Sequence, residues 1–410
     1  MKICRHSGGF AMYDVAAVRK RFPALNEGAA HFDGPGGTQV PDTVADAVAE
    51  TLRSAVANRG SRTAAERRAD DIVLQARHAM ADLLGAVPSG IVFGRSMTQL
   101  TYDLARTLAK QWGPGDEVIV TRLDHDANIR PWVHAAESRG ATIRWAPFDR
   151  DTGELPIEAI TALLSEHTRL VAVPAASNLL GTRPDVPTIA THVHAAGALL
   201  YVDGVHLTPH APVDITTLSA DFYACSPYKF LGPHLGVLAA SPALLETIHP
   251  DKLLPATDAV PERFEHGTLP YELLAGTTAA VEFLAKLVPG DGPRRDRLTR
   301  SMTELEHHEQ SMLDRLELGL SNIPAVHPHG SPTRKRTPTT LFSIDDIPPT
   351  KAHEFLATRA VNAPAGHFYA LECSRWLGLG DTGAIRAGIA PYTDESDVDR
   401  LLKAITELAT

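Results

Sequence analysis

A lysine and an aspartate stand directly behind runs of apolar residues, where proteins with parallel sheets place reactive side chains. Lys229 closes the segment 226–229 behind one run, and Asp203, 26 residues earlier, closes the run Leu199–Asp203. A lysine amine forms a Schiff base with an aldehyde, and a carboxylate can keep a pyridine nitrogen protonated. Alone, such a lysine is usually solvated, and such an aspartate is often a helix cap. Together at this separation they indicate an anchor for pyridoxal 5′-phosphate (PLP), with Lys229 as the point of attachment.

Seven short apolar runs predict the strands that position these residues. Several runs are aliphatic or β-branched without alternation, which is typical of strands buried on both faces. Stretches with helical apolar spacing, such as Gln99–Lys110 and Pro187–Ala196, lie between most of them. This alternation predicts an α/β fold with a mostly parallel sheet covered by helices. The predicted strands are Ile91–Gly94, Glu117–Thr121, Thr142–Phe148, Leu170–Ala175, Leu199–Asp203, Phe222–Cys225 and Gly236–Ala240.

The pattern changes after residue 240. Residues 271–287 and 294–318 read as long helices, and a Pro- and Gly-rich stretch spans residues 324–338. Two further strands, each followed by a helix, predict a small α+β domain. These four elements are Thr339–Ile344, Pro349–Arg359, Ile385–Ala390 and Ser396–Leu408.

Three parts of the chain follow from this reading. Residues 42–56 and 63–86 read as helical and precede the first strand. We expect an N-terminal segment, residues 1–30, that packs on the small domain. The large domain would span residues 31–290 and the small C-terminal domain residues 291–410.

The bulk composition is that of an ordinary soluble protein. The chain has 410 residues with 44% hydrophobic and 21% charged residues, and its formal net charge of −10 provides no electrostatic footprint for nucleic acid. No apolar run approaches the roughly 18 residues of a membrane span, and no apolar stretch follows the N-terminal charges as in a signal peptide. Met12 could serve as a start as well as Met1.

The cysteines favour a reducing compartment. There are three of them, Cys4, Cys225 and Cys373, too widely spaced for a CxxC zinc or redox site. We expect reduced thiols, a cytoplasmic protein and no bound metal.

Further motifs accompany the lysine and the aspartate in a recurrent order. They are His31–Gln39 (HFDGPGGTQ), Asp124–Trp132 (DHDANIRPW), Ser177–Thr182 (SNLLGT), Phe264–Thr268 (FEHGT) and Gly366-His367. In this order the motifs resemble those of class V aminotransferase-fold (fold-type I) PLP enzymes, specifically the cysteine desulfurase-like branch. The resemblance runs from His31 to near the C-terminus. It implies a mostly parallel seven-stranded sheet in a large PLP-binding domain, with a small α+β C-terminal domain.

The resemblance also implies roles around the cofactor ring. Lys229 would hold PLP and move the proton between the substrate Cα and the cofactor. Asp203 would pair with the pyridine nitrogen, and His206 would lie within reach of the phenolic oxygen. His125 would stack on the ring and act as an acid or base, since imidazole titrates near neutrality.

The cofactor phosphate is expected at a strand-to-helix turn, residues 94–99, where free backbone N–H groups of a helix N-terminus can bind it. A simple helix cap is the alternative interpretation of Ser96. Thr268 would reach the phosphate of a neighbouring subunit, which implies a homodimer with active sites at the subunit interface. The resemblance places these residues near the phosphate: Ser96, Met97, Thr98, Ser226, Tyr228 and Thr268.

The substrate, an amino acid, would be held by its carboxylate. The resemblance assigns Asn178 and Arg386 to that group, because arginine binds a carboxylate with two parallel hydrogen bonds. A salt bridge within the small domain is the alternative for Arg386. The other residues expected to contact the substrate are Gly36, His367, Phe368 and Tyr369.

One segment departs from the desulfurase pattern. Relatives of that branch carry the sulfur-accepting cysteine in a Gly-His-His-Cys segment, whereas residues 366–369 here read Gly-His-Phe-Tyr. A phenol such as that of Tyr369 cannot accept sulfane sulfur. Cys373 could replace the missing thiol only if the loop were rearranged. We expect Cys373 and Cys225 to be buried structural thiols.

We therefore expect a PLP-dependent C–S lyase. It would act by β-elimination on cysteine or an S-substituted cysteine, releasing a thiol or sulfide, pyruvate and ammonia. Phe368 and Tyr369 favour a substrate bulkier than cysteine, such as a conjugate from specialised metabolism. The alternatives are decarboxylation-linked oxidative deamination, transamination, epimerisation and cysteine desulfuration. A catalytically dead binding module is a further alternative, but such a module has no physical need for Lys229 together with Asp203.

Overall fold

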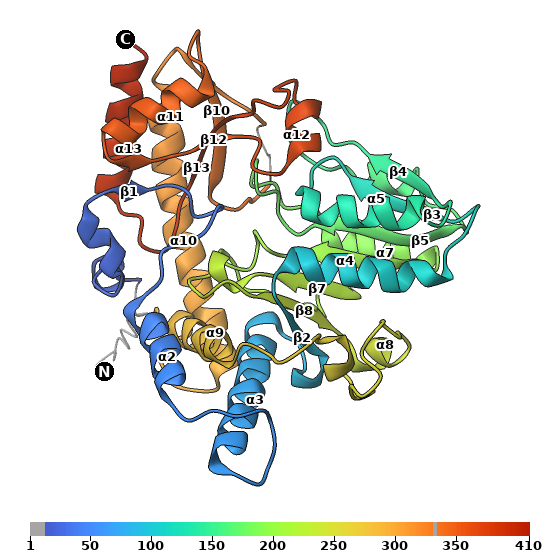
Figure 1. The fold of residues 1–410 in the computed structure, drawn as a ribbon. Coiled ribbons are helices and arrows are strands. Elements are labelled where there is room, and N and C mark those ends of the chain that lie inside the picture. Colours follow the sequence, from blue (N-terminus) through green and yellow to red (C-terminus); the bar gives the residue numbers. More distant parts are fainter. Residues whose placement is uncertain (1–12, 331–333) are drawn as a thin grey trace, which may run out of the picture.

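A seven-stranded sheet forms the centre of the larger part of the chain (Figure 1). The computed structural model describes residues 13–330 and 334–410. The strands are β2 (Ile91–Gly94), β3 (Glu117–Thr121), β4 (Thr142–Ala146), β5 (Thr168–Pro174), β6 (Leu199–Asp203), β7 (Phe222–Cys225) and β8 (Gly236–Ala240). They lie in the order β2-β8-β7-β6-β5-β3-β4, and β8 alone in this sheet runs antiparallel to its neighbours. The predicted α/β class and mostly parallel sheet are confirmed.

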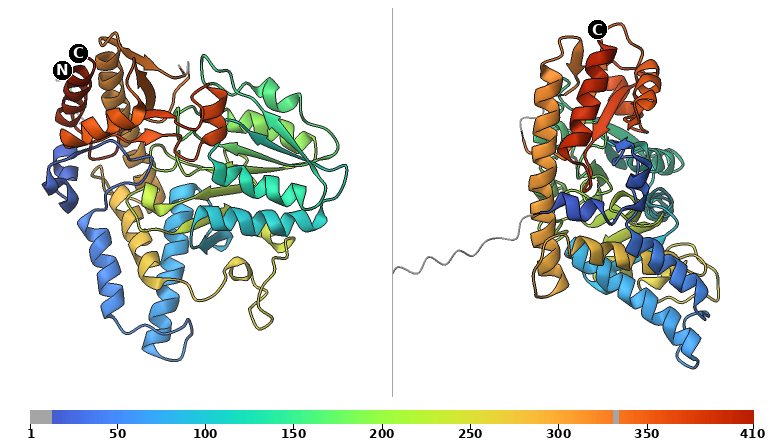
Figure 2. Two further views of the ribbon diagram at one scale, coloured as in Figure 1. Left: turned by 45° about the horizontal axis from the view of Figure 1, so that its top comes forward. Right: turned by 90° about the vertical axis from the view of Figure 1, so that its left-hand side faces the viewer.

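Helices cover both faces of this sheet. They are α2 (Asp42–Arg53), α3 (Ala64–Leu84), α4 (Met97–Leu108), α5 (Arg130–Glu137), α6 (Ile157–Thr161), α7 (Val186–Ala195), α8 (Pro242–Glu246), α9 (Tyr271–Leu284) and α10 (Arg294–Ser321). Side chains of α4, α5 and α8 pack on one face, those of α3, α7, α9 and α10 belong to the core on the other, and α2 packs on α9. Figure 2 shows the helices on either side of the sheet.

Alternate residues of each strand therefore enter different cores. In β6, Leu200 and Val202 pack in the core of α3 and α7, whereas Tyr201 packs in the core of α4 and α5. Successive side chains of a strand point to opposite faces. Because both faces are buried, both sets of positions are apolar, and the strands appear in the sequence as runs without alternation.

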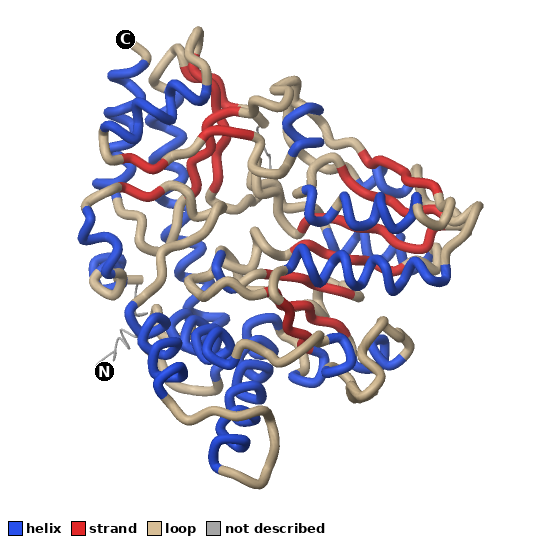
Figure 3. The backbone as a smooth tube through the Cα atoms, viewed as in Figure 1, coloured by secondary structure: helices blue, strands red, loops and turns tan. Residues whose placement is uncertain are grey.

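A second sheet lies in the C-terminal part of the chain (Figure 3). Its four strands have the order β12-β13-β10-β9, and all the pairs are antiparallel. They are β9 (Val326–Pro328), β10 (Thr339–Ile344), β12 (Ala365–Gly366) and β13 (Ala384–Gly388). Helices α11 (Pro349–Thr358) and α13 (Glu395–Leu408) share a core with this sheet and with the C-terminal half of α10.

The N-terminal residues that the structure describes contact this C-terminal part. Tyr13 stacks on His308 of α10 with ring centroids 4.7 Å apart, and Arg19, the last residue of α1 (Val15–Arg19), pairs with Asp394 at 3.0 Å. The short strand β1 (Ala30–His31) pairs with β11 (Val361–Asn362). On these contacts we propose the division into a large domain, residues 31–290, a small domain, residues 291–410, and an N-terminal segment packed on the latter. Residues 1–12 of that segment lie outside the described residues.

The elements that the sequence did not predict are short. Strands β1, β11 and β12 have two residues each and β9 has three, and α12 (Leu371–Trp376) has six. Such lengths are too short to show an apolar period. Among residues 13–330 and 334–410, no helix is long and apolar enough to cross a membrane.

Candidate active site

A cavity of about 610 Å³ opens at the carboxyl ends of the parallel strands. Asp124 follows β3, Asn178 follows β5, Asp203 ends β6, and Ser226 follows β7, and all four line the cavity. Residues of the small domain, Phe368 to Tyr369 and Arg386, close it from the other side. The cavity thus lies where α/β proteins bind their ligands.

Lys229, four residues after β7, and Asp203, the last residue of β6, both line this cavity. The Lys229 ammonium donates a hydrogen bond to the backbone oxygen of Pro35 and lies 4.7 Å from the centre of the Tyr228 ring. Burial, together with the charge of Arg386, lowers the pKa of Lys229 to about 7. A substantial fraction of this amine is therefore neutral at pH 7, the form that attacks a carbonyl or accepts a proton.

Asp203 is a buried carboxylate with one free oxygen. Its Oδ1 accepts the N–H of Val205 at 2.9 Å, whereas its Oδ2 has no hydrogen-bond partner among the described residues. Burial raises the pKa of Asp203, and it raises the pKa of the neighbouring Asp124 as well. A cationic donor at Oδ2 would favour the ionised form of Asp203.

The two histidines predicted around the cofactor ring, His125 and His206, both line the cavity, in neutral form. His125 Nδ1 accepts the N–H of Ala127 at 3.0 Å, and burial and nearby cations, first among them Lys229, lower the pKa of His125 to about 3. The pKa of His125 therefore lies well below the near-neutral value expected from an imidazole alone. His206 is buried, its Nε2 lies 3.1 Å from Thr339 Oγ1, and burial lowers its pKa well below the usual value.

The residues predicted for the phosphate separate into two groups. Met97, Thr98, Ser226 and Tyr228 line the cavity, and the hydroxyl of Ser226 is without a partner in the part of the chain that the structure describes. Ser96 instead caps α4, where its Oγ accepts the N–H of Gln99 at 3.1 Å. Ser96 is thus a helix cap in this structure, which was the alternative interpretation of this residue.

Thr268 lies outside this cavity as well. It lines a second hollow with Arg95, Gln99 and His266, beyond the N-terminal turn of α4. That position is compatible with a role toward a second copy of the chain, and it excludes Thr268 from the cavity of its own chain.

Arg386 lies on β13 and reaches the cavity from the small domain. Its two terminal nitrogens donate one hydrogen bond each, to the backbone oxygen of Asn178 at 3.1 Å and to Asp33 at 2.7 Å. The Phe368 ring lies 3.8 Å from the guanidinium carbon. Asn178 donates to the backbone oxygen of Phe368 at 3.0 Å, and its buried Oδ1 has no partner among the described residues. This corner therefore retains free donors on Arg386 and a free amide oxygen.

The remaining predicted substrate residues belong to two loops. Gly36 lines the cavity and leaves no room for a side chain, since a Cβ would lie 2.3 Å from Asp33. Phe368 and Tyr369 line it from the loop between β12 and α12, whereas His367 does not. Cys373 and Cys225 are buried, and burial raises the pKa of both thiols, as expected of structural cysteines.

Five charged or polar residues of the cavity were not predicted as site residues, namely Asp33, Tyr102, Asp124, Asp126 and Arg130. Asp33 pairs with Arg386, which lies 353 positions away in the sequence, so no local sequence pattern could indicate this pair. Tyr102 follows Thr98 by one helical turn, and Arg130 follows Asp126 by one turn and pairs with it at 2.8 Å. The spacing of four residues from a predicted site residue was the signal available for Tyr102.

Comparison with known proteins identifies the family. The family model described as aminotransferase class-V matches residues 30–401. The chain belongs to this family. It is 35% identical over 399 residues to an uncharacterised protein of Mycobacterium tuberculosis, which covers 97% of this chain and 99% of that protein. An aminotransferase-like protein of Gibberella zeae is 33% identical over 413 residues, covering 96% and 98% of the two chains.

A solved structure agrees with this assignment. The cysteine desulfurase CsdA of Escherichia coli matches with a TM-score of 0.85 and 27% identity, over 96% of this chain and 98% of that chain. The chain is a fold-type I PLP enzyme of the class V aminotransferase and cysteine desulfurase group. The inferred cofactor and fold are thereby confirmed.

The residues of the cavity fit PLP. A buried amine with a lowered pKa, Lys229, can hold the aldehyde. Asp203 presents an unpaired oxygen that a protonated ring nitrogen would satisfy. The N-terminus of the 12-residue helix α4 and the free hydroxyl of Ser226 are suitable donors for a phosphate.

Proposed function

We propose that the protein is a C–S lyase that cleaves cysteine or an S-substituted cysteine by β-elimination. The observation that carries this proposal is the combination of Lys229 and Arg386 in one cavity whose described lining residues include no thiol. Sulfur cannot be stored on a protein group there, and elimination requires no such group. The substrate and water are converted to a thiol, pyruvate and ammonium, so no oxidant or reductant is needed.

The carboxylate corner orients the substrate. The free N–H groups of Arg386 would bind the substrate carboxylate in a water-poor site, where charged hydrogen bonds are strongest. One N–H of the Asn178 amide is engaged with the backbone oxygen of Phe368, and its free Oδ1 would accept a hydrogen bond from the ammonium of the incoming substrate. Two fixed points would direct the Cα–H bond toward Lys229.

Lys229 would move the proton. When bound, PLP supplies an electron sink that stabilises negative charge at Cα. The lowered pKa of Lys229 keeps a neutral amine available near pH 7, and this amine can take the Cα proton. His125, neutral and held by the N–H of Ala127, would pack against the ring plane. Departure of the sulfur as a thiol or thiolate then completes the elimination.

The exposed position of Thr268 supports a homodimer. We propose that Thr268 of one copy completes the phosphate site of the other, because Thr268 lies outside the cavity of its own chain and beside the N-terminal turn of α4. The variant Thr268→Ala would then retain less PLP on dialysis, whereas the exposed Thr410→Ala would retain as much as the parent.

The function is tested by product analysis on the PLP-loaded protein. Incubation with S-substituted cysteines should release thiol and pyruvate in equal amounts. Lys229→Ala should abolish both products and the visible absorption band of the bound cofactor, whereas Lys403→Ala, an exposed lysine, should leave both intact. Release of carbon dioxide together with an aldehyde or hydrogen peroxide would contradict the lyase and indicate oxidative deamination. Formation of a persulfide on Cys373 would also contradict the lyase and indicate desulfuration.

A further inference from the structure

The loop that bears Phe368 and Tyr369 has an uncommon backbone. Phe368 has a φ of 49° and Tyr369 a φ of 59°, both in the left-handed region that residues with side chains seldom adopt. Two consecutive aromatic residues in this region are unfavourable, and they persist only where the surroundings determine the conformation. Such positions cluster at sites of function.

Contacts from the large domain hold this loop in place. The N–H of Asp126 donates to the backbone oxygen of Tyr369 at 2.7 Å, and the Asn178 amide donates to that of Phe368 at 3.0 Å. Trp376 of α12 contacts two arginines, with the guanidinium carbons of Arg122 and Arg150 at 5.0 Å and 4.2 Å from the centre of its ring. Its indole N–H donates to the backbone oxygen of Phe148 at 2.8 Å. The loop therefore forms a fixed wall of the cavity.

The two rings of this wall have different partners. Phe368 covers the guanidinium of Arg386, so its ring is engaged within the protein. Tyr369 lies beside His125, with centroids 5.6 Å apart and planes inclined by 26°, yet it is 71% exposed. Among the Phe, Trp and Tyr residues within 13–330 and 334–410, Tyr369 alone is exposed. Its ring is thus held rigidly at the cavity with most of its surface uncovered.

The charged groups around Tyr369 are paired with one another. Arg130 contacts Asp126 at 2.8 Å and Glu372 at 3.4 Å, and Arg122 contacts Glu372 at 3.1 Å. These pairs leave no strong demand for a charged ligand at this wall. The uncovered feature is an aromatic face, which favours a planar aromatic partner in an offset stack.

We propose that Tyr369 is a specificity-determining residue that selects cysteine conjugates whose sulfur carries a planar aromatic group. This inference rests on the proposed function, since it names the substituent that leaves with the sulfur. With the amino-acid end of the substrate fixed at Arg386 and Lys229, the sulfur substituent extends toward the remaining wall, where Tyr369 stacks on it. A saturated ring of equal size fills the same space without that stacking.

The test compares two substituents of nearly equal size, S-phenyl-L-cysteine and S-cyclohexyl-L-cysteine. Thiophenolate leaves more readily than cyclohexanethiolate, so kcat differs between the two compounds without any stacking, and the ratio of the KM values is the measure of the stacking. In the parent protein KM should be about 3- to 10-fold lower for the phenyl compound. Tyr369→Phe should keep this ratio, and Tyr369→Leu should reduce it toward one. Tyr369→Asn provides a second variant, because asparagine tolerates the left-handed backbone. A ratio that is unchanged in Tyr369→Leu and Tyr369→Asn would overturn the inference.

A binding experiment separates this inference from the proposed function. 2-Amino-4-phenylbutanoate and 2-amino-4-cyclohexylbutanoate carry CH₂ in place of sulfur and cannot undergo the elimination. Their binding, followed by the change in the visible spectrum of the bound cofactor, should show the same preference and the same dependence on Tyr369. Preference for the phenyl analogue without pyruvate from any conjugate would overturn the lyase and support the aromatic site. Release of pyruvate without any preference for the phenyl compounds would support the lyase and overturn the aromatic site.

Discussion

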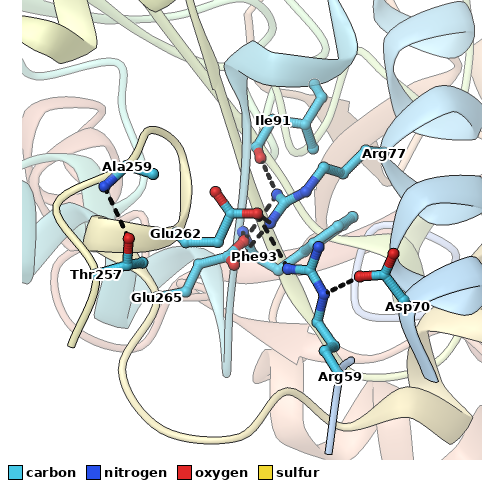
Figure 4. Close-up of polar contacts among 9 residues, drawn as sticks. All are labelled: Arg59, Asp70, Arg77, Ile91, Phe93, Thr257, Ala259, Glu262 and Glu265. Atoms are coloured by element: carbon cyan, nitrogen blue, oxygen red, sulfur yellow. Dashed lines mark hydrogen bonds and ion pairs between the residues drawn. The ribbon is translucent and has the colours of Figure 1, made fainter. Parts of the chain in front are cut away.

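Two buried arginines of this protein differ in how completely the protein satisfies them. Arg77 of α3 is 3% exposed, and each of its terminal nitrogens donates two hydrogen bonds, to Glu265, Glu262 and the backbone oxygen of Ile91 (Figure 4). Arg386 is 1% exposed, and each of its terminal nitrogens donates one. The Nε of each arginine is buried without a partner among the described residues. The two differ at the terminal nitrogens, where Arg386 retains donors for a further partner.

The carboxylates differ in the same way. Glu265 is almost fully buried, lies against both terminal nitrogens of Arg77 at 2.9 and 2.8 Å, and also accepts the N–H of Phe93. The Asp33 side chain is 44% exposed and meets Arg386 through one oxygen at 2.7 Å. A saturated pair joins elements of the fold, here α3, β2 and the segment around Glu265. A half-saturated pair beside a cavity leaves donors of the arginine free at that cavity.

The largest expected effect concerns the saturated pair. Arg77→Met should lower the free energy of unfolding by about 3–5 kcal/mol, because Glu265 would remain as an unpaired buried charge. Denaturant unfolding of the cofactor-free protein measures this change. Arg53→Met, at an exposed arginine of α2, is the control and should change stability by less than about 0.5 kcal/mol. Equal stability of Arg77→Met and Arg53→Met would contradict the structural role of Arg77 on which its comparison with Arg386 rests.

The half-saturated pair should show its effect in binding. Arg386→Met should raise KM for the amino-acid substrate about 100-fold, since hydrogen bonds to a charged group contribute about 1.5–3 kcal/mol each. Asp33 is exposed enough for water to solvate it, so the loss of stability should be smaller than for Arg77→Met. Arg386→Lys, which keeps the charge without the paired N–H groups, should recover only part of the affinity. An unchanged KM in Arg386→Met would show that Arg386 serves only the Asp33 pair.

The third prediction concerns pH, because Arg386 also acts on Lys229 through its charge. In the cofactor-free protein the pKa of Lys229 is lowered from 10.5 to about 7, so between these values the unfolded chain binds more protons than the folded one. Stability should therefore rise with pH from about 7 toward 10.5, with a slope of at most about 1.4 kcal/mol per pH unit from this residue. Below pH 7 both states are protonated and this contribution is flat.

Unfolding curves at several pH values test this sign. The difference in the free energy of unfolding between the parent and Lys229→Met should rise with pH with this slope. Arg386→Met should raise the pKa of Lys229 and so shorten the pH range over which stability rises. A parallel pH dependence in the parent and Lys229→Met would contradict the lowered pKa.

The smallest effect is expected at the rim of the saturated pair. Glu262 bridges Arg59 at 3.0 Å and Arg77 at 3.4 Å, and its side chain is partly exposed (Figure 4). Glu262→Gln should therefore lower stability by about 1 kcal/mol or less, and salt should diminish the difference. A loss as large as that of Arg77→Met would mean that Glu262, rather than Glu265, is the main partner.

Much of the large domain and of the cofactor anchor follows from local sequence. Six of the seven strands of its sheet are largely apolar segments, the edge strand β4 being the exception, and Lys229 and Asp203 close or follow two of the six. A strand end fixes where its last side chains emerge, so residues at the ends of parallel strands necessarily share one edge. For this reason Asp203, Ser226 and Lys229 could be placed at one site before their distances were known.

Contacts between distant segments were decided by the tertiary structure alone. The Asp33–Arg386 pair joins residues 353 positions apart, and the left-handed backbone of Phe368 and Tyr369 is held by donors that follow β3 and β5. Nothing in a Gly-His-Phe-Tyr segment predicts that conformation, because it is unfavourable locally and is stabilised by the other domain. The sequence by itself determined the sheet and placed Lys229 and Asp203 at one edge of it. The packing of the small domain on that sheet decided which donors of Arg386 stay free and which aromatic rings line the cavity.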